Sequence, residues 1–407
     1  MLNKNFKIMK KISFIIFLAC AISMQLQAQV ITQLGQWSNN ANFAVEYYQD
    51  KVITSTTSGI KFIYVSNPSN PVPTTTLASP NNFPMAITVD GSYAFFGGGM
   101  TGYFMIADIS SINSPVQVGI TYDINGTAYQ IAVKGNYAFM PTSYDTLYAI
   151  DISNKSLPIV IDRIGMGNFS SGVAIKGNYA YIGTAGGLKV VDISNPSNLN
   201  VLSNMNGVYS EVLADLPNNR LFVAKPNQGF DVVDITNPAS PSILFQGSGG
   251  NSGGDLVYKN GFVFQVGSAD VSAFQIGVSS ATYLTSFNST VSGQVNAICA
   301  KDSVFYLSTV NNLHVLKLSY LTGMEDNSPL ETAIFYLNPA EGVISLKFTS
   351  SPPSNIKLYD IMGKLVKQFN SNFSKNLQIG IADLNSGIYF VSFDESYLER
   401  RIKFVKR

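Results

Sequence analysis

Apolar and polar residues alternate in short runs along most of this chain, and turn-forming residues separate the runs. A representative stretch is Lys176–Gly183, which reads KGNYAYIG and is followed by Gly187–Pro196, which reads GLKVVDISNP. Apolar-rich runs bounded by Gly, Asn and Pro are typical of β-strands joined by hairpin turns. The same tract lacks the three-to-four-residue spacing of an amphipathic helix. The pattern predicts an all-β protein.

The same phrase recurs along the chain at a nearly constant interval. We take as an anchor the residue that follows the first turn of each repeat. The seven anchors are Val52, Tyr93, Tyr137, Tyr179, Leu221, Phe262 and Val304. Their spacing, between 41 and 44 residues, is typical of a radial or solenoidal array of β units.

Each repeat contains four candidate strands, which is the composition of one propeller blade. The last repeat lacks a convincing fourth strand, but Val30–Trp37 has the pattern of one. That segment can complete the last blade and leave no free sheet edge between the first and last blades. We therefore predict a seven-bladed β-propeller over residues 29–319. An open solenoid is the alternative, and it would need capping repeats.

The two ends of the chain differ from the repeats. Residues 1–28 combine four lysines, the apolar run Ile12–Ile22 and a small-residue site ending at Ala28, which predicts a cleaved signal peptide. Acylation of Cys20 is the alternative reading of that segment. The apolar run is too short to span a bilayer, so we expect an exported chain with no transmembrane span once it is cleaved. Residues 320–331 are a polar linker, and residues 332–407 predict a small antiparallel β-sandwich.

Charge and cysteine content narrow the function further. Residues 29–331 contain 12 Lys and Arg against 19 Asp and Glu, a net charge of −7. The negative charge of the propeller argues against nucleic acid or anionic lipid as its ligand. After cleavage at Ala28 only Cys299 remains, so an internal disulfide is impossible, and its apolar surroundings predict a buried, inert thiol.

The end of the chain carries four ordered motifs. These are Tyr336–Gly342 (YLNPAEG), Ile356–Val366 (IKLYDIMGKLV), Leu384–Val391 (LNSGIYFV) and the terminal Lys403–Lys406 (KFVK). Their order and spacing resemble the C-terminal sorting domain of type IX (Por) secretion cargo. The matching positions are Asn338, Pro339, Asp360, Gly363, Lys364, Gly387, Tyr389, Lys403 and Lys406. The resemblance implies export through the type IX machinery, followed by release or attachment at the cell surface.

The repeats are in turn similar to the LVIVD family, whose name matches the strand Leu188–Asp192 (LKVVD). The likeness covers most of the chain that follows the signal peptide and extends through the Asn195-Pro196 turn. That resemblance implies a propeller on an exported or surface protein. It implies no shared catalytic activity.

Catalytic and metal chemistry finds little support in the sequence. The single histidine, His314, excludes any His pair, and we interpret it as an exposed or hydrogen-bonded strand residue. The recurring Asp108, Asp151, Asp192 and Asp234 precede Ile-Ser or Ile-Thr at a turn, so we predict that they cap turns rather than form a carboxylate ring. We expect no catalytic residue, no metal and no cofactor.

The loops that lead into the innermost strands and those that join the second and third strands share one propeller face. Aromatic, amide and charged side chains suited to a sugar or peptide ligand gather there. The candidates are Tyr129, Gln130, Tyr144, Tyr209, Glu211, Lys225, Asn227, Asp255, Asn311 and Asn312. Our leading hypothesis is a non-enzymatic protein that binds a glycan or protein. The alternatives are a polysaccharide-active enzyme using Glu211 and Asp255 as a carboxylate pair, and a purely structural spacer.

Overall fold

The computed structural model divides the chain into two compact units, Met1–Leu321 and Thr322–Arg407. The residues that it describes are 29–38, 42–80, 83–99, 102–226, 228–248, 252–259, 261–268, 270–277, 279–288, 295–320, 333–336, 342–348, 355–360, 365–370, 376–395 and 398–406. The predicted signal peptide lies outside these residues, and so does the linker except for Tyr320.

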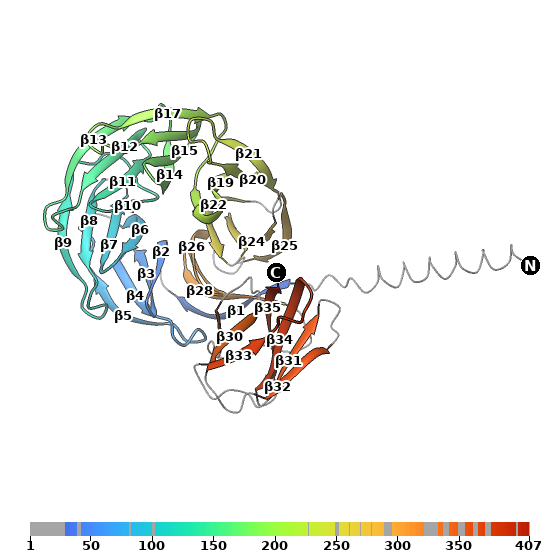
Figure 1. The fold of residues 1–407 in the computed structure, drawn as a ribbon. Helices are drawn as coiled ribbons and strands as arrows, with labels where there is room; N and C mark the ends of the chain where they lie inside the picture. The colour runs from blue at the N-terminus through green and yellow to red at the C-terminus, as the bar shows by residue number, and fades with distance from the viewer. Residues whose placement is uncertain are drawn as a thin grey trace, which may run out of the picture. The chain divides into compact units, whose positions relative to one another are not determined.

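Seven sheets of four antiparallel strands form the first unit, and Figure 1 shows them arranged around a ring. Blades 1 and 2 contain β2 (Asn42–Tyr48), β3 (Lys51–Thr56), β4 (Gly59–Tyr64), β5 (Val72–Leu77), β6 (Pro84–Asp90), β7 (Tyr93–Gly98), β8 (Phe104–Asp108) and β9 (Val116–Thr121). Blades 3 and 4 contain β10 (Ala132–Lys134), β11 (Tyr137–Thr142), β12 (Thr146–Asp151), β13 (Ile159–Gly165), β14 (Ser170–Lys176), β15 (Tyr179–Thr184), β16 (Gly187–Asp192) and β17 (Asn200–Met205).

Blades 5 and 6 follow with the same strand order, and blade 5 also holds a short 3-10 helix. They contain β18 (Val212–Asp215), η1 (Leu216–Asn218), β19 (Arg220–Lys225), β20 (Gly229–Asp234), β21 (Ser242–Gly247), β22 (Ser252–Lys259), β23 (Phe262–Gly267), β24 (Asp270–Ile276) and β25 (Ala281–Asn288). Blade 7 contains β26 (Val295–Lys301), β27 (Val304–Thr309), β28 (Asn312–Tyr320) and, from the start of the chain, β1 (Gln29–Ser38).

The strand β1 completes blade 7, as the sequence predicts. It pairs antiparallel with β28 from Gln29 opposite Tyr320 to Ser38 opposite Asn312. A bulge at Gly35 brings β1 against blade 1, where a Cβ atom on that glycine would lie 2.3 Å from the carbonyl oxygen of Pro68. The seven-bladed propeller closed by an N-terminal strand is therefore confirmed.

Burial within a blade follows the position of each strand. In blade 4 the second and third strands, β15 and β16, are buried at almost every residue, because neighbouring blades cover both of their faces. The fourth strand, β17, alternates between exposed and half-buried residues at the rim of the ring. Buried clusters cross from blade to blade, and Phe139 and Leu147 of blade 3 pack with Val173 and Ile182 of blade 4. The core is thus distributed around the ring between adjacent sheets.

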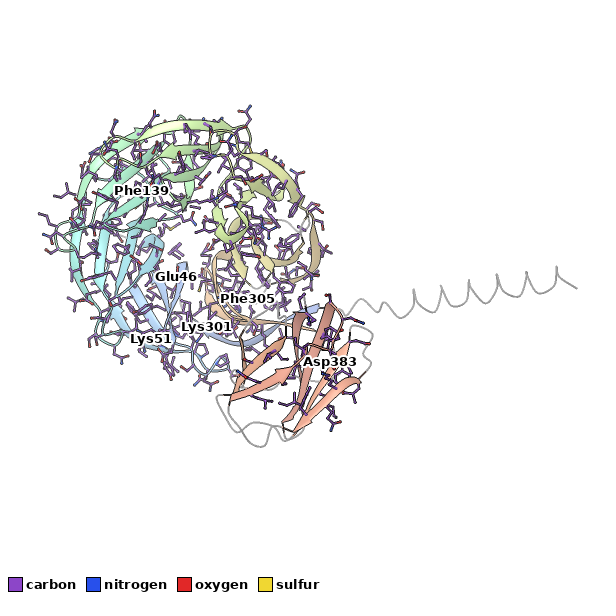
Figure 2. All side chains as sticks on the ribbon, in the orientation of Figure 1. Glu46, Lys51, Phe139, Lys301, Phe305 and Asp383 are labelled. Atoms are coloured by element: carbon purple, nitrogen blue, oxygen red, sulfur yellow. The ribbon has the colours of Figure 1, made fainter. Side chains whose placement is uncertain are left out.

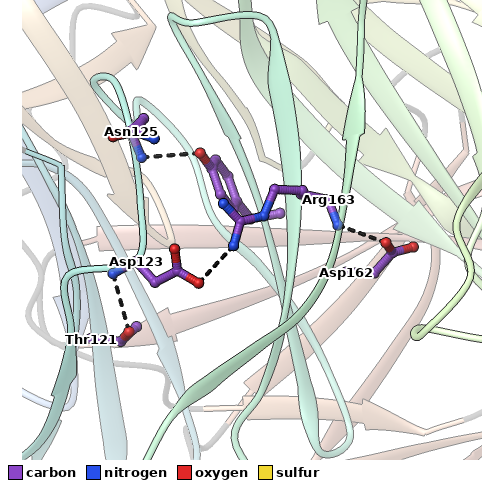
Figure 3. A network of polar contacts seen from close by, with 6 residues as sticks. Thr121, Asp123, Asn125, Asp162 and Arg163 are labelled. Carbon is purple, nitrogen blue, oxygen red and sulfur yellow. Dashed lines mark hydrogen bonds and ion pairs between the residues drawn. The ribbon is translucent and has the colours of Figure 1, made fainter.

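Polar contacts also link adjacent blades, and Figure 3 shows one such network. Arg163 of blade 3 forms an ion pair of 2.6 Å with Asp123, which follows the outer strand of blade 2. The guanidinium group also lies over the ring of Tyr148, 5.5 Å from its centroid. The neighbouring Asp162 accepts a hydrogen bond of 2.6 Å from the backbone N–H of Leu199 in blade 4. Three consecutive blades are joined in this way.

The recurring aspartates cap turns, which confirms the sequence interpretation. In each of the four repeats the carboxylate accepts a 2.8 Å hydrogen bond from the backbone N–H two residues further on. For Asp192 the donor is Ser194, and this bond lowers the pKa of the carboxyl group. These side chains lie near the rim of the ring, in third strands, far from its innermost strands.

Two of the seven anchors were assigned one residue too late. In blade 2, Tyr93 is the first residue of the second strand and pairs with the last residue of the inner strand. The equivalent residues are Lys51 in blade 1 and Arg220 in blade 5, rather than the predicted Val52 and Leu221. Both repeats lack the Gly-containing turn that is present in blades 2, 3, 4 and 6. Blade 1 turns at Gln49, which has a φ of 55°, and blade 5 turns through η1.

The second unit consists of two antiparallel sheets that share one buried cluster. The three-stranded sheet contains β29 (Ala333–Tyr336), β30 (Val343–Phe348) and β33 (Asn376–Gly380). The four-stranded sheet contains β31 (Asn355–Asp360), β32 (Leu365–Asn370), β34 (Gly387–Glu395) and β35 (Leu398–Lys406). Ile344 and Ile379 of the first sheet pack with Leu358 and Val391 of the second. The strand β29 was not predicted from the sequence.

Candidate functional site

A cavity of about 620 Å³ opens among the innermost strands of the propeller. All seven blades contribute to its lining, mostly through residues at or just before the start of β2, β6, β10, β14, β18, β22 and β26. Several of these strands carry a bulge near their first residues, for example between Ser170 and Gly172 in β14. A bulge turns side chains away from the regular alternation of a strand.

Three carboxyl groups line one side of the cavity, and we call them the acidic arc: Glu211 of blade 5, Asp255 of blade 6 and Glu46 of blade 1. The thiol of Cys299, from blade 7, lies between the blades of Asp255 and Glu46. Figure 2 shows Glu46 on the inner side of the ring, beside its central opening. Their charges interact, because Asp255 raises the pKa of both glutamates.

Backbone geometry determines where Glu211 stands. Its segment approaches β14 so closely that a Cβ atom on Gly172 would lie 2.2 Å from the carbonyl oxygen of Ser210. Only glycine permits that approach of the two chains. The Ser171 hydroxyl then donates a 3.1 Å hydrogen bond to the same oxygen. The side chain of Glu211 faces the cavity and has no hydrogen-bond partner among the described residues.

Asp255 is held more firmly than Glu211. One of its carboxylate oxygens accepts a 2.8 Å hydrogen bond from the backbone N–H of Leu256, and the other accepts one of 2.9 Å from Ile298. Burial raises the pKa of Asp255 to about 6, and these two N–H groups limit the rise. The carboxylate thus bridges β22 and β26 while it also lines the cavity.

Burial dominates the electrostatics of the whole arc. It raises the pKa of Glu46 to about 7, although the backbone N–H of Tyr47 donates a 3.0 Å hydrogen bond to that carboxylate. Burial and the charge of Asp255 raise the pKa of Glu211 well above its usual range. Each side chain keeps part of its surface open to the cavity, while protein atoms surround it on the remaining sides. Burial also raises the pKa of the Cys299 thiol, as expected for an inert cysteine.

The opposite side of the cavity carries aromatic side chains. Tyr129 of blade 3 and Phe169 of blade 4 lie with their ring centroids 5.8 Å apart, and we call this pair the aromatic arc. They are 38% and 46% exposed, respectively, so both rings remain open to a ligand. Phe43 of blade 1 also lines the cavity and stacks on Phe83, with centroids 3.7 Å apart.

The cavity brings together four of the ten predicted ligand-binding residues: Tyr129, Gln130, Glu211 and Asp255. Gln130 is engaged by the protein, because its side-chain oxygen accepts a hydrogen bond from the N–H of Val173 and its nitrogen donates one of 3.2 Å to the carbonyl of Val212. It therefore ties blades 3, 4 and 5 together. Tyr129, Glu211 and Asp255 keep surface for a ligand.

The other predicted residues lie elsewhere. Tyr209 is buried and donates a 2.9 Å hydrogen bond to Asp231, and Lys225 forms an ion pair of 3.3 Å with the same carboxylate. Tyr144 is 68% exposed on the β11–β12 loop, outside the cavity lining. Asn311 and Asn312 form the turn between β27 and β28, also outside that lining. Asn227 lies outside the described residues.

Several residues of the site were not predicted from the sequence. Glu46 lies within an innermost strand rather than in a loop, and Phe43 and Phe169 stand just where inner strands begin. The available signal was an isolated carboxylate directly after the apolar run Phe43–Val45.

His314 is a hydrogen-bonded strand residue, which is one of the two interpretations that the sequence left open. It is only 3% exposed, and its Nδ1 atom lies 2.9 Å from the side-chain oxygen of Gln33 in β1. Its Nε2 atom has no partner among the described residues. Burial lowers the pKa of this histidine, so it stays neutral at physiological pH. It lies outside the cavity lining and contributes to ring closure through β1.

The described residues contain no group of three or more His, Cys, Asp or Glu side chains arranged to hold a metal ion. Within the same part of the chain, no helix is long and apolar enough to cross a bilayer.

The sorting-domain motif includes a recognisable structural device. The Tyr389 hydroxyl donates a 2.9 Å hydrogen bond to the carbonyl oxygen of Asn385, four residues upstream, which is the arrangement of a tyrosine corner. Gly387 begins β34, and Asp360 ends β31 opposite Tyr389. Lys403 and Lys406 lie on β35. The remaining motif positions, Asn338, Pro339, Gly363 and Lys364, lie outside the described residues.

Solved structures define the class of this fold as a β-propeller. The β-propeller domain of Myceliophteria thermophila Cps50 (Swd1) aligns with a TM-score of 0.60 at 8% identity, covering 71% of this chain and 100% of that domain. The WD40 β-propeller domain of Doa1 aligns at 0.57 and 9% identity, covering 70% and 97%. The computationally designed Ika8 protein aligns at 0.51 and 13% identity, covering 70% and 99%. These similarities establish the fold alone.

Family models then identify the two parts of the chain. The LVIVD repeat matches residues 85–123, 125–164, 168–207 and 218–246. The secretion system C-terminal sorting domain matches residues 335–407. The chain therefore carries LVIVD repeats and a sorting domain of the type IX secretion system, whose machinery it engages. It is an exported protein, secreted or attached to the cell surface. No curated protein matches the sequence.

The raised pKa of Glu46 predicts a measurable pH dependence of stability. Between the ordinary value of 4.5 and the folded value of about 7 the folded protein holds a proton that the unfolded chain has lost. Stability therefore falls as the pH rises through this window. We expect Glu46→Gln to unfold like the parent near pH 4.5 and to be more stable at pH 8, by on the order of 1–2 kcal/mol.

Chemical denaturation at both pH values measures this difference. Asp90→Asn, at the exposed end of β6, is the matched control and should leave the pH dependence unchanged. Equal stability of Glu46→Gln and the parent at pH 8 would contradict the assignment.

Proposed function

We propose that this protein is an exported, non-enzymatic β-propeller that binds part of a glycan or protein in its central cavity. One observation carries the proposal: a single cavity of about 620 Å³ gathers exposed aromatic rings on one side and carboxyl groups on the other. Concave sites with apolar walls and a few convergent polar groups are where proteins bind small ligands. Two of the rings, Tyr129 and Phe169, keep more than a third of their surface open.

The supporting comparison lies within the molecule itself. The repeats are alike in their second and third strands, which are buried between blades, and they differ at the starts of the inner strands. Variation confined to one concave surface is expected of a scaffold that presents a binding site. A structural spacer would gain nothing from carboxyl groups that are costly to bury.

Paired tyrosine variants test the proposal. Tyr129 borders the cavity, whereas Tyr144 is a more exposed tyrosine of the same blade that lies outside the cavity lining. The purified protein is screened on glycan and peptide arrays, and dissociation constants are then measured for its ligands. We expect Tyr129→Ala to weaken binding by about tenfold or more, the typical cost of losing an aromatic anchor, and Tyr144→Ala to leave it within about twofold. Equal effects of both variants, or no ligand at all, would contradict a cavity-based binding function.

A second candidate function is hydrolysis of a polysaccharide by Glu211 and Asp255. The observation that favours it is the contrast between the two groups, since Glu211 has no partner among the described residues and favours its protonated form, while two N–H groups favour ionised Asp255. Acid and base pairs in enzymes have their pKa values separated in this way. Against it, both oxygens of Asp255 are already hydrogen-bonded to backbone. Release of reducing ends from an oligosaccharide, lost in Glu211→Gln, would favour the enzyme.

A further inference from the structure

In the acidic arc several carboxyl groups share one cavity without a basic side chain among the described lining residues. Glu211, Asp255 and Glu46 face the same volume from blades 5, 6 and 1, and none of the described lining residues is Lys, Arg or His. Burying carboxylates without a cation is unfavourable, and like charges in one site add to the cost.

Elsewhere the propeller pairs each fully buried carboxylate with a cation of its own. Asp215, 4% exposed, lies 2.7 Å from Nε of Arg220. Asp231, 1% exposed, lies 3.3 Å from Nζ of Lys225. The side chain of Glu211 differs from both, because it is partly open to the cavity and no described residue forms a hydrogen bond or an ion pair with its carboxyl group.

We propose that the cavity binds a primary ammonium group carried on an apolar stem, with the ammonium between Glu211 and Asp255. This inference rests on the proposed function and names the chemistry of its ligand. An ammonium group has three N–H donors, enough to reach the free lone pairs of two or three carboxylates. Leu213 and Val257 supply apolar surface beside the acidic arc, and the rings of Tyr129 and Phe169 supply apolar surface for the stem.

A metal ion fits this site less well than an organic cation. A bound Ca²⁺ needs six to eight oxygen ligands within about 2.6 Å. The described residues offer no cluster of three acidic, His or Cys groups that converges on one point. The carboxyl groups instead surround a volume of about 620 Å³, which is large enough for an alkyl chain.

Binding of such a cation must release protons. The titratable groups that face the cavity are Glu46, Glu211, Asp255, Cys299 and Tyr129. Burial keeps Cys299 and Tyr129 neutral by raising the pKa of each. The three carboxyl groups carry part of their protons near neutral pH, and a cation favours their ionised forms. Affinity should therefore rise between pH 5 and pH 8.

Isothermal titration calorimetry of the purified protein with butylammonium tests the proposal, with butan-1-ol as the neutral probe of similar shape. We expect butylammonium to bind at least tenfold more tightly than the alcohol at pH 8, and about tenfold more tightly than it binds at pH 5. The heat should also depend on the ionisation enthalpy of the buffer. Glu211→Gln should weaken binding at least tenfold, while Asp90→Asn should leave it unchanged. Melting curves at pH 8 will show whether Glu211→Gln is still folded.

Each outcome decides a separate point. Equal binding of the amine and the alcohol, or full affinity in Glu211→Gln, overturns the inference. Glucosamine binding more tightly than butylammonium would overturn the apolar stem and assign an amino sugar. Neutral array ligands that depend on Tyr129 but show no preference for an ammonium group would overturn the inference and leave the proposed binding function standing. If neither the arrays nor the amine show Tyr129-dependent binding, both proposals fall.

Discussion

Deletion of residues 29–38 is expected to open the ring and abolish a stable fold. The strand β1 supplies the fourth strand of blade 7 and buries Ile31, which is 7% exposed. Trp37 and Leu34 pack against the cluster in which Val45 of blade 1 meets Val315 of blade 7. Losing two or three such side chains costs about 1.5–3 kcal/mol each, and the deletion also exposes the edge of β28. The sum approaches the whole stability of an ordinary domain.

The melting temperature of the deletion variant, its rescue by a peptide and two point variants test the role of β1. The deletion variant should unfold at least about 10 °C below the parent or aggregate, and a synthetic peptide of Gln29–Ser38 should restore part of the loss. The point variants Ile31→Ala and Thr32→Ala compare neighbouring residues, one buried and one exposed. We expect a loss of about 2–4 kcal/mol for the first and within about 0.5 kcal/mol for the second. An unchanged melting temperature after deletion would contradict closure of the ring by β1.

The second large effect concerns the buried ion pair of blade 5. Asp215 accepts hydrogen bonds from Arg220, at 2.7 Å, and from Asn218, at 2.8 Å. Arg220 also donates a 3.3 Å hydrogen bond to the carbonyl of Gly277, in the loop that follows β24 of blade 6. Arg220→Met leaves Asp215 buried without its cation, and we expect a loss of about 3–5 kcal/mol. Asp215→Asn combined with Arg220→Met should recover part of that loss, because it removes the unpaired charge.

The same substitution at an exposed ion pair is the matched control. Arg163 and Asp123 lie 2.6 Å apart with side chains 47% and 57% exposed. Solvent screens such pairs, so Arg163→Met should cost less than about 1 kcal/mol. Urea unfolding of the variants measures both effects. Similar losses of unfolding free energy in Arg163→Met and Arg220→Met would show that burial does not determine how much these ion pairs contribute to stability.

The fold could be predicted from the sequence because its repeat is long and its turns are chemically explicit. Lys-Gly-Asn turns and Asp-Ile-Ser-Asn-Pro segments mark strand ends, so a constant spacing sufficed to count blades and to assign Val30–Trp37 to the last one. The predicted strand starts were wrong by one residue in the two blades where a different turn replaces these residues. Gln49 and η1 turn the chain without the usual glycine, and the anchors in blades 1 and 5 moved by one residue.

The site could be predicted only in part, because loop position is a weak guide to side-chain direction. Tyr209 lies in the loop before β18 and Lys225 ends β19, yet both side chains contact buried Asp231. Glu46 faces the cavity from within a strand. Its role depends on which way β2 presents its side chains after the bulge between Asn42 and Val45. A bulge changes this direction without a distinctive sequence, so the acidic arc became visible only with the backbone in place.

A crystal structure of the protein grown with butylammonium at pH 8 tests most directly whether the cavity is the functional site. We predict density for the amine in the central cavity, with its nitrogen about 2.7–3.0 Å from carboxylate oxygens of Glu211 and Asp255. The butyl chain should lie toward Tyr129 and Phe169. A cavity that holds only water while the amine binds elsewhere, or a Glu211 carboxyl group turned away to a partner within the protein, would contradict it.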